Sequence, residues 1–153
     1  MAPNTKNRLL LIERVLLLKS VSIFSETPET ILAEIAYLMQ EEMVAGNKPI
    51  VVEGEAGNCM YIIFSGGVKV EKGGQLLASL KDREFFGELS LLDTETRSAS
   101  VTSTSDCLLF RIDQEPFYDL IECRPEVVKG VIQNLCKRLR AANHKVWELS
   151  KTT

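Results

Sequence analysis

Residues 85–101 carry an acidic and a basic side chain on either side of a short apolar run. Gly87 has no side chain, so the backbone can approach a ligand closely there, and the free amides of a helical turn that follows it favour an anion. The guanidinium of Arg97 would supply the countercharge through two charge-assisted hydrogen bonds to phosphate oxygens, with the hydroxyl of Ser98 beside it. These residue types at this spacing predict a phosphate site.

Glu88 is the unexpected member of this group, because a carboxylate repels a phosphate. If Glu88 lies in the site it must face a donor, and a sugar hydroxyl is the donor that accompanies a phosphate in a nucleotide. The run therefore predicts a nucleotide site. The alternative is that Glu88 and Arg97 form a buried ion pair at a strand–helix junction, with no ligand at all.

The same run resembles the phosphate-binding cassette of the cyclic nucleotide-binding domain family. The family pattern is F-G-E-(L/I)-A-L-(L/I), three variable residues, and then P-R-(A/T/S)-A-(T/S)-V. A second stretch, residues 46–70, resembles the first half of the family's β-roll, so the resemblance extends over residues 21–139. The cassette positions that match are Phe86, Gly87, Glu88, Leu89, Leu91, Leu92, Arg97, Ser98, Ala99, Ser100 and Val101.

The resemblance implies a role for the cassette residues. Backbone amides of Gly87 and Leu89 would bind the cyclic phosphate, Glu88 would bind the ribose 2′-hydroxyl, and Arg97 would pair with the exocyclic phosphate oxygen. The whole predicted ligand-binding set is Phe86, Gly87, Glu88, Leu89, Ser90, Arg97, Ser98 and Ala99.

Two positions depart from the family pattern. Thr96 stands where proline is usual, and Arg83 stands where glycine is usual before the two aromatic residues. A loop without proline is less rigid, and we expect both changes to weaken ligand affinity.

Length and charge restrict the alternatives. The chain has 153 residues, 45% of them hydrophobic, which suits one core, so a single domain over residues 1–153 is expected. The net charge of −3 argues against a nucleic-acid partner, and the apolar stretch Leu9–Leu18 is interrupted by charges, so it predicts neither a signal peptide nor a membrane span. The four cysteines show no paired spacing and lie among apolar residues, as reduced and buried cysteines do. A cytoplasmic protein is expected.

Three segments must position the cassette: N-terminal helices (1–40), a β-roll (41–112) and C-terminal helices (113–150). The first is expected to hold a helix over Arg8–Lys19 and a second that begins after Thr27 as N-cap and ends near Gln40. Short β-rich runs separated by glycines then predict an antiparallel β-roll or jelly-roll-like barrel, so the fold is mainly β with flanking helices. The expected strands are 49–53, 59–65, 68–71, 75–80, 98–104 and 107–112.

The C-terminal segment predicts a short helix capped by Asp113 and a longer one that Pro125 opens and that ends near Leu149. Apolar residues recur along the longer helix at alternating spacings of four and three, which is a heptad pattern. This stripe predicts either a face that lies on the barrel or a parallel homodimer. The apolar helix at Leu9–Leu18 presents a similar choice between the barrel, a second subunit and a domain outside this chain. The stripe consists of Val128, Ile132, Leu135, Leu139, Ala142, Val146 and Leu149.

The function that the resemblance implies is a non-catalytic sensor that binds cyclic AMP, favoured over cyclic GMP, and uses no metal or other cofactor. Ligand would draw the cassette helix inward, and contacts of Leu91 and Leu92 with Phe117 would let the terminal helices swing onto the barrel. The effector would be another protein or a domain outside this chain. The base would be capped by one side chain of the last helix: Asn134, Asn143 or Trp147.

Two other functions stay open. A cupin-like metal-dependent enzyme would share the barrel, but such sites gather several histidines, and the only one here, His144, is expected on the surface. No catalytic triad can be drawn from it, so we expect no enzyme. The other alternative is a degenerate domain that serves only as an interaction module, although the retained Glu88 and Arg97 argue against it.

Overall fold

The computed structural model describes residues 5–151, with side-chain surroundings from Leu10 onward. Within this range, eight strands form two four-stranded antiparallel sheets, in the orders β1-β8-β3-β6 and β2-β7-β4-β5. The strands are β1 (Gln40–Val44), β2 (Pro49–Val51), β3 (Cys59–Ser65), β4 (Val68–Lys72), β5 (Gln75–Leu80), β6 (Phe85–Phe86), β7 (Ser100–Ser103) and β8 (Cys107–Asp113).

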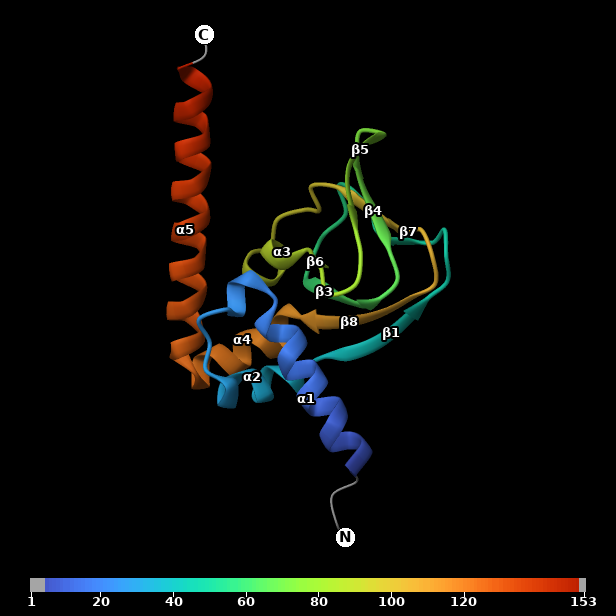
Figure 1. Cartoon of the computed structure of the whole chain (residues 1–153), viewed down its shortest axis with the longest axis vertical. Coiled ribbons are helices and arrows are strands. Elements are labelled where there is room, and N and C mark those ends of the chain that lie inside the picture. The colour runs from blue at the N-terminus through green and yellow to red at the C-terminus, as the bar shows by residue number, and fades with distance from the viewer. Residues whose placement is uncertain (1–4, 152–153) are drawn as a thin grey trace.

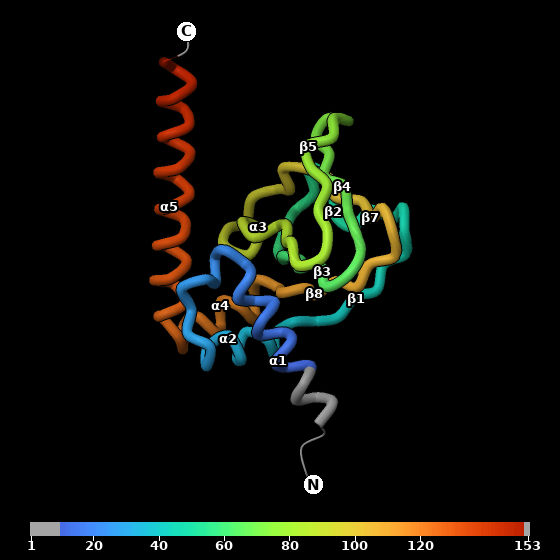
Figure 2. Tube along the Cα trace, viewed as in Figure 1, coloured from blue at the N-terminus to red at the C-terminus, as the bar shows by residue number. Residues whose placement is uncertain are grey.

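Helices flank this β-roll. In Figure 1, α2 and α4 lie between α5 and the strands β1 and β8, and α5 stands at one side of the molecule. Figure 2 shows that β4 and β5 form a hairpin at the end of the roll away from α1. The helices are α1 (Thr5–Lys19), the 3-10 helix η1 (Ser22–Phe24), α2 (Glu29–Ala36), α3 (Glu88–Leu92), α4 (Gln114–Cys123) and α5 (Pro125–Ser150).

The prediction of a mainly β roll with flanking helices is confirmed. The strands make two separate sheets rather than one closed barrel. Six predicted strands and the two C-terminal helices occur close to their expected positions. Among residues 5–151, no helix is both long and apolar enough to cross a membrane.

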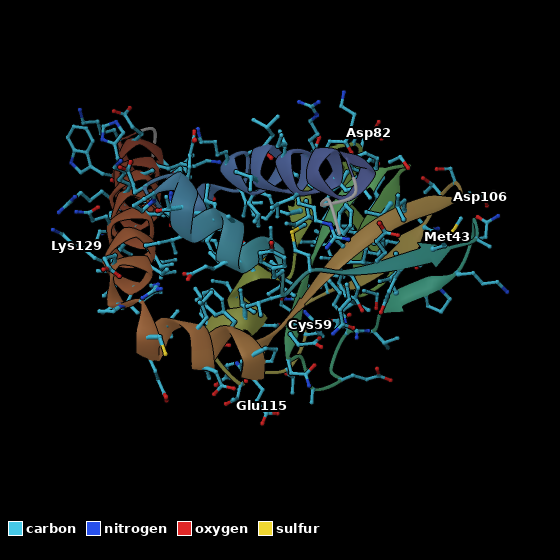
Figure 3. The ribbon with its side chains drawn as sticks, turned by 90° about the horizontal axis from the view of Figure 1, so that it is seen from below. Met43, Cys59, Asp82, Asp106, Glu115 and Lys129 are labelled. Atoms are coloured by element: carbon cyan, nitrogen blue, oxygen red, sulfur yellow. The ribbon has the colours of Figure 1, made fainter. Side chains whose placement is uncertain are left out.

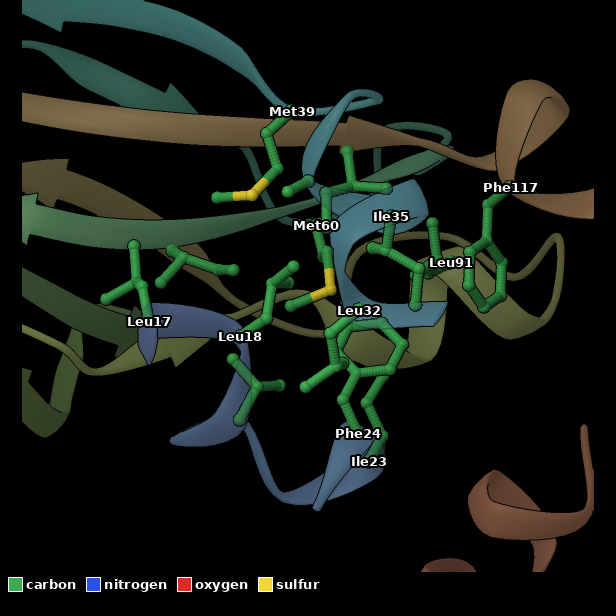
Figure 4. Close-up of a cluster of buried hydrophobic side chains, with 14 of the residues drawn as sticks. Leu17, Leu18, Ile23, Phe24, Leu32, Ile35, Met39, Met60, Leu91 and Phe117 are labelled. Atoms are coloured by element: carbon green, nitrogen blue, oxygen red, sulfur yellow. The ribbon is translucent and has the colours of Figure 1, made fainter. Parts of the chain in front are cut away.

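Two apolar clusters hold the fold together, one on each face of the sheet that contains β3. Alternate residues of β3 point to opposite faces of this sheet, so they contribute to different clusters. Tyr61 and Ile63 lie in a cluster between the two sheets. Met60 and Ile62 lie in a second cluster, under the helices. Helices α1 and α2 lie side by side over this second cluster (Figure 3). Leu91 of α3 and Phe117 of α4 are buried in it with Met60 (Figure 4), so the cassette helix shares a core with the terminal helices.

Several local predictions are wrong. Helix α2 begins at Glu29 with Pro28 as N-cap, and the hydroxyl of Thr27 makes no capping hydrogen bond. The helix ends at Ala36, because Gln40 already opens strand β1, which pairs with β8. The cysteines differ from the expectation too: Cys59 and Cys107 are buried, and Cys123 and Cys136 are exposed.

The apolar stripe of α5 does not lie on the roll along its length. The buried face of the helix is Val127, Gly130 and Val131, at its N-terminal end. Val128 and Leu135 are half-buried, while the later members of the stripe, from Leu139 onward, are exposed. The apolar residues of α1 are likewise only partly buried. Leu17 and Leu18 are buried, whereas Ile12 and Leu16 are exposed. The surroundings of the Leu9 side chain lie outside the described residues.

Candidate functional site

Gly87 begins the candidate site, directly after β6. Its φ of +77° lies in the left-handed region, where it serves as N-cap of α3. A Cβ atom at this position would lie 2.6 Å from Nη1 of Arg97 and 3.2 Å from the carbonyl oxygen of Cys59. Glycine is therefore needed at position 87 for two reasons: the backbone conformation is left-handed, and the arginine occupies the space of a side chain.

Arg97 is only 9% exposed, and its backbone is fixed on both sides. Its N–H donates to the carbonyl of Glu55 at 2.8 Å, and its own carbonyl accepts from the N–H of Gly54 at 2.9 Å. In the side chain, Nη2 donates to Sγ of Cys59 at 3.2 Å, while Nη1 is buried without a hydrogen-bond partner among the described residues. Leaving a buried charged donor unpaired is costly, so this position favours a bound anion.

A cavity of about 390 Å³ lies beside Arg97, between α3 and the start of β7. This volume is within the usual range for small-molecule sites. All eight predicted ligand-binding residues, which come from two separate stretches of the cassette, line this cavity together. The predicted ligand-binding set left out six other lining residues. Thr96 and Val101 were named only as positions of the cassette. The other four are Val51, Val70, Asp93 and Glu95.

The two missed valines, Val51 of β2 and Val70 of β4, add apolar side chains to the lining of the cavity. They reach the site through strand pairing, since β7 lies between β2 and β4 in its sheet. Nothing in the local sequence of Val51 or Val70 indicates a binding role. Their position suits a flat apolar group such as a nucleobase.

Glu88 does not pair with Arg97, so the alternative of a buried Glu88–Arg97 ion pair is wrong. Its Oε1 instead accepts a hydrogen bond from Nη1 of Arg138 in α5 at 2.9 Å. Nη2 of Arg138 also donates to the hydroxyl of Ser22 in η1. Arg138 therefore joins the cassette helix to both the N-terminal and the C-terminal helical segments.

The C-terminal end of α3 is bound by two side chains of α4. Nε2 of Gln114 donates to the carbonyls of Ser90 and Asp93, at 3.2 and 2.7 Å, and the hydroxyl of Tyr118 donates to the carbonyl of Leu92 at 2.7 Å. The last carbonyls of a helix have no partner within it, so these contacts satisfy them. A movement of α3 would thus be transmitted to α4 by hydrogen bonds as well as by apolar packing.

The predicted base-capping residues do not line the cavity. Asn143 and Trp147 are exposed on α5, and Asn134 is half-buried with its Oδ1 unpartnered among the described residues. His144 is exposed as expected, 3.5 Å from a carboxylate oxygen of Glu148. Within the described part of the chain, no group of three or more histidine, cysteine or acidic residues could hold a metal ion.

The fold and the site define a β-roll domain with a buried arginine beside a cavity, and this arrangement can be compared with known families. Residues 41–123, more than half of the chain, match the cyclic nucleotide-binding domain family. The chain belongs to this family.

Particular relatives are a cyclic AMP receptor protein and a cyclic-GMP-dependent kinase. The chain is 36% identical over 121 residues to the cyclic AMP receptor protein of Thermus thermophilus, which covers 76% of this chain and 56% of that protein. It is 31% identical over 148 residues to human cGMP-dependent protein kinase 2, which covers 88% of this chain and 19% of the kinase. The chain thus spans about half of the first relative and a fifth of the second.

A solved structure supports the fold. The N-terminal domain of a transcriptional regulator from Streptomyces coelicolor A3(2) aligns with a TM-score of 0.78 and 26% identity, over 84% of this chain and 95% of that domain.

Proposed function

We propose that this chain is a single, non-catalytic sensor domain that binds a cyclic nucleotide in the cavity beside Arg97. The observation that carries the proposal is the buried guanidinium, whose Nη1 has no hydrogen-bond partner among the described residues and lies next to Gly87. A cyclic phosphate would satisfy it. Ser98 and the first amides of α3 would complete the phosphate site, and Glu88 would accept a hydrogen bond from the ribose 2′-hydroxyl.

Cyclic AMP is the ligand that we propose over cyclic GMP. The relative named a cyclic AMP receptor protein is 36% identical over 121 residues, and a relative named a cGMP-dependent protein kinase reaches the same 36% over only 98 residues. The charges of the cavity favour a cyclic phosphate of either kind over a linear one. Arg97 is the one cation among its lining residues, and Asp93 and Glu95 add negative charge at the rim, so a phosphate monoester with two negative charges would be disfavoured.

Ligand binding would change the packing of the terminal helices. Phosphate binding would pull Gly87 and the first turn of α3 toward the ligand. Helix α4 would move with α3, because Gln114 and Tyr118 are hydrogen-bonded to the end of α3. Helix α5 begins directly after α4, so it would follow in turn. We propose this as a shift between two packings of a common core, in which Leu91 and Phe117 are both buried.

We also propose a parallel homodimer through α5. Ile132, Leu139 and Val146 follow the heptad pattern, and each is more than half exposed. A stripe of this kind is normally covered by a second helix. Substitution Leu139→Lys should yield a monomer by sedimentation, whereas Gln133→Lys, which adds the same charge off the stripe, should not. A monomeric parent protein would contradict the dimer.

A thermal-shift panel tests the sensor function. Cyclic AMP should raise the melting temperature most, cyclic GMP less, and linear 5′-AMP least, because ligand that binds only the folded state stabilises it. The absence of any shift would favour the interaction-module alternative. The effector, and the expected absence of a nucleic-acid partner, stay predictions.

A further inference from the structure

Cys59 contacts Arg97, which lines the nucleotide cavity, and itself lines a second, polar cavity. Its Sγ accepts a hydrogen bond from Nη2 of Arg97 at 3.2 Å. The residue is only 6% exposed, but it lines a cavity of about 550 Å³ together with Asn58, Tyr61, Arg111, Asp113, Gln114, Glu115 and Pro116. Figure 3 labels Cys59 and Glu115, which both line this second cavity. A small polar molecule in the second cavity can therefore reach the sulfur without passing through the nucleotide site.

The cation beside this sulfur lacks an anionic partner. Arg97 is nine-tenths buried, and among the described residues no carboxylate lies within ion-pair distance of it. One terminal guanidinium nitrogen, Nη2, donates to Sγ of Cys59, and the other, Nη1, is buried without a partner in the part of the chain that the structure describes. An anionic group on the sulfur would give the Arg97 guanidinium an anionic partner in place of a ligand phosphate.

We propose that Cys59 is an oxidation site for hydrogen peroxide, and that its oxidation closes the nucleotide site. The regulatory half of this inference rests on the proposed function. The sulfur attacks one peroxide oxygen, an S–O bond forms as the O–O bond breaks, and the departing hydroxide takes the thiol proton to become water. Sulfur loses two electrons and peroxide gains them. A second peroxide repeats the step and leaves a sulfinic acid and a second water, and the sulfinic acid releases its proton to solvent to become a sulfinate anion.

The surroundings of the sulfur suit this product. A sulfinate oxygen would lie against Arg97 and form a charge-assisted hydrogen bond, which withdraws the guanidinium from the nucleotide phosphate. Tyr61 lines the second cavity with Cys59, and burial raises the pKa of Tyr61, so its hydroxyl stays protonated and can donate a hydrogen bond.

Cys107 is a matched control within the same chain. It is 4% exposed and also lines a cavity, so its burial and access are similar. Its thiol, however, lies 3.3 and 3.2 Å from the carbonyl oxygens of Gly67 and Ser105 and donates to them. Carbonyl oxygens disfavour an anionic sulfur, so Cys107 should resist the oxidation that Cys59 undergoes.

The experiment uses the full chain with Cys123→Ser and Cys136→Ser, which removes the two exposed thiols. After graded hydrogen peroxide, peptide mass spectrometry should show two oxygens added at Cys59 well before Cys107. Cyclic AMP affinity should fall at least about tenfold in step with that addition. Peroxide treatment should not change the cyclic AMP affinity of the Cys59→Ser variant. It should still lower the cyclic AMP affinity of the Cys107→Ser variant.

The inference is overturned if Cys59 is oxidised no faster than Cys107, or if it is oxidised without loss of affinity. If the untreated protein binds no cyclic nucleotide, the proposed function is wrong, and so is the inference that oxidation of Cys59 closes the nucleotide site. The mass-spectrometric comparison of the two cysteines needs no ligand, so it decides separately whether Cys59 is an oxidation site. Should Cys59→Ser not fold, the wild-type comparison of oxidation with affinity still decides the outcome.

Discussion

Glu88 of α3 and Arg138 of α5 form a hydrogen-bonded ion pair of 2.9 Å, which links the nucleotide cavity directly to the last helix. The pair is partly shielded, since the Glu88 side chain is 20% exposed. Arg138 occupies one carboxylate oxygen, so the other stays available for a ribose hydroxyl. Arg138 would then orient the residue that recognises ribose.

Substitution Arg138→Gln tests this role. Cyclic AMP affinity should fall about fivefold, as the loss of one hydrogen bond of about 1 kcal/mol predicts. With 2′-deoxy cyclic AMP the loss should disappear, because Glu88 then has no hydroxyl to bind. The neighbouring Lys137→Gln, which removes only an exposed contact with Glu26, serves as control in calorimetric titrations. Equal losses for both ligands would separate Arg138 from ribose recognition.

Gly57 is expected to be a further requirement of the site. A Cβ atom there would lie 2.6 Å from Oγ of Ser90 and 2.7 Å from Nε of Arg97, and Gly57 has no positive φ. Gly57→Ala should therefore displace the arginine without straining its own backbone. We expect cyclic AMP affinity to fall at least about tenfold, equivalent to about 1.4 kcal/mol.

The control for this substitution is Gly46→Ala, where a Cβ atom would make only ordinary contacts of 3.4 Å or more. Its affinity should match that of the wild type. If Gly57→Ala binds as tightly as Gly46→Ala, the close packing around Arg97 is unimportant for the ligand.

The hydroxyl of Tyr118 should carry the ligand response to α5. Tyr118→Phe removes the hydrogen bond to the carbonyl of Leu92 and the weaker one, of 3.3 Å, that the hydroxyl accepts from Nε2 of Gln114. Because Trp147 is the one tryptophan of the chain and lies on α5, its fluorescence reports on this helix. We expect the change of Trp147 fluorescence on adding cyclic AMP to shrink in Tyr118→Phe, with affinity kept within about threefold, since the residue does not line the nucleotide cavity.

Exposed Tyr37 provides the matched control, Tyr37→Phe. A Trp147 response that is the same in Tyr118→Phe and Tyr37→Phe would show that the hydrogen bond plays no part in coupling.

Arg83 should lower stability through its backbone. Its φ of +71° lies in the left-handed region, which costs a side chain about 1 kcal/mol that glycine avoids. Arg83→Gly should raise the free energy of unfolding by up to about 1 kcal/mol in urea titrations, less the entropy that glycine gains in the unfolded chain. Asn47→Gly, at φ +61°, should gain less because asparagine tolerates this conformation. A free energy of unfolding below that of the wild type in Arg83→Gly would show that the backbone of Arg83 is not strained.

The parts of the site that were predicted from sequence are local. The glycine that admits a ligand close to the backbone, the short helix after it and the arginine that follows lie within residues 85–101, so their spacing carries the signal. The same holds for the long helix opened by Pro125. The residues that were missed reach the site through tertiary packing. Arg138 meets Glu88 across 50 positions of sequence, and no periodicity of α5 distinguishes it from its neighbours.

Two missed strands have a similar explanation. Strand β6 has only two residues, and its pairing with Tyr61 and Ile62 defines it rather than any pattern of its own. Strand β1 lies at the edge of its sheet and is partly exposed on both faces, so its sequence lacks the usual alternation of apolar and polar residues.

Calorimetric titration of the wild type and of Arg97→Ala with cyclic AMP tests the central claim most directly. Arg140→Ala, on the exposed surface of α5, is the control for the loss of an arginine. We expect Arg97→Ala to bind about two orders of magnitude more weakly, because a buried charge-assisted partner is lost, and Arg140→Ala to bind as the wild type does. Unchanged affinity in a folded Arg97→Ala variant, or a wild type that binds neither cyclic AMP nor cyclic GMP, would contradict the account.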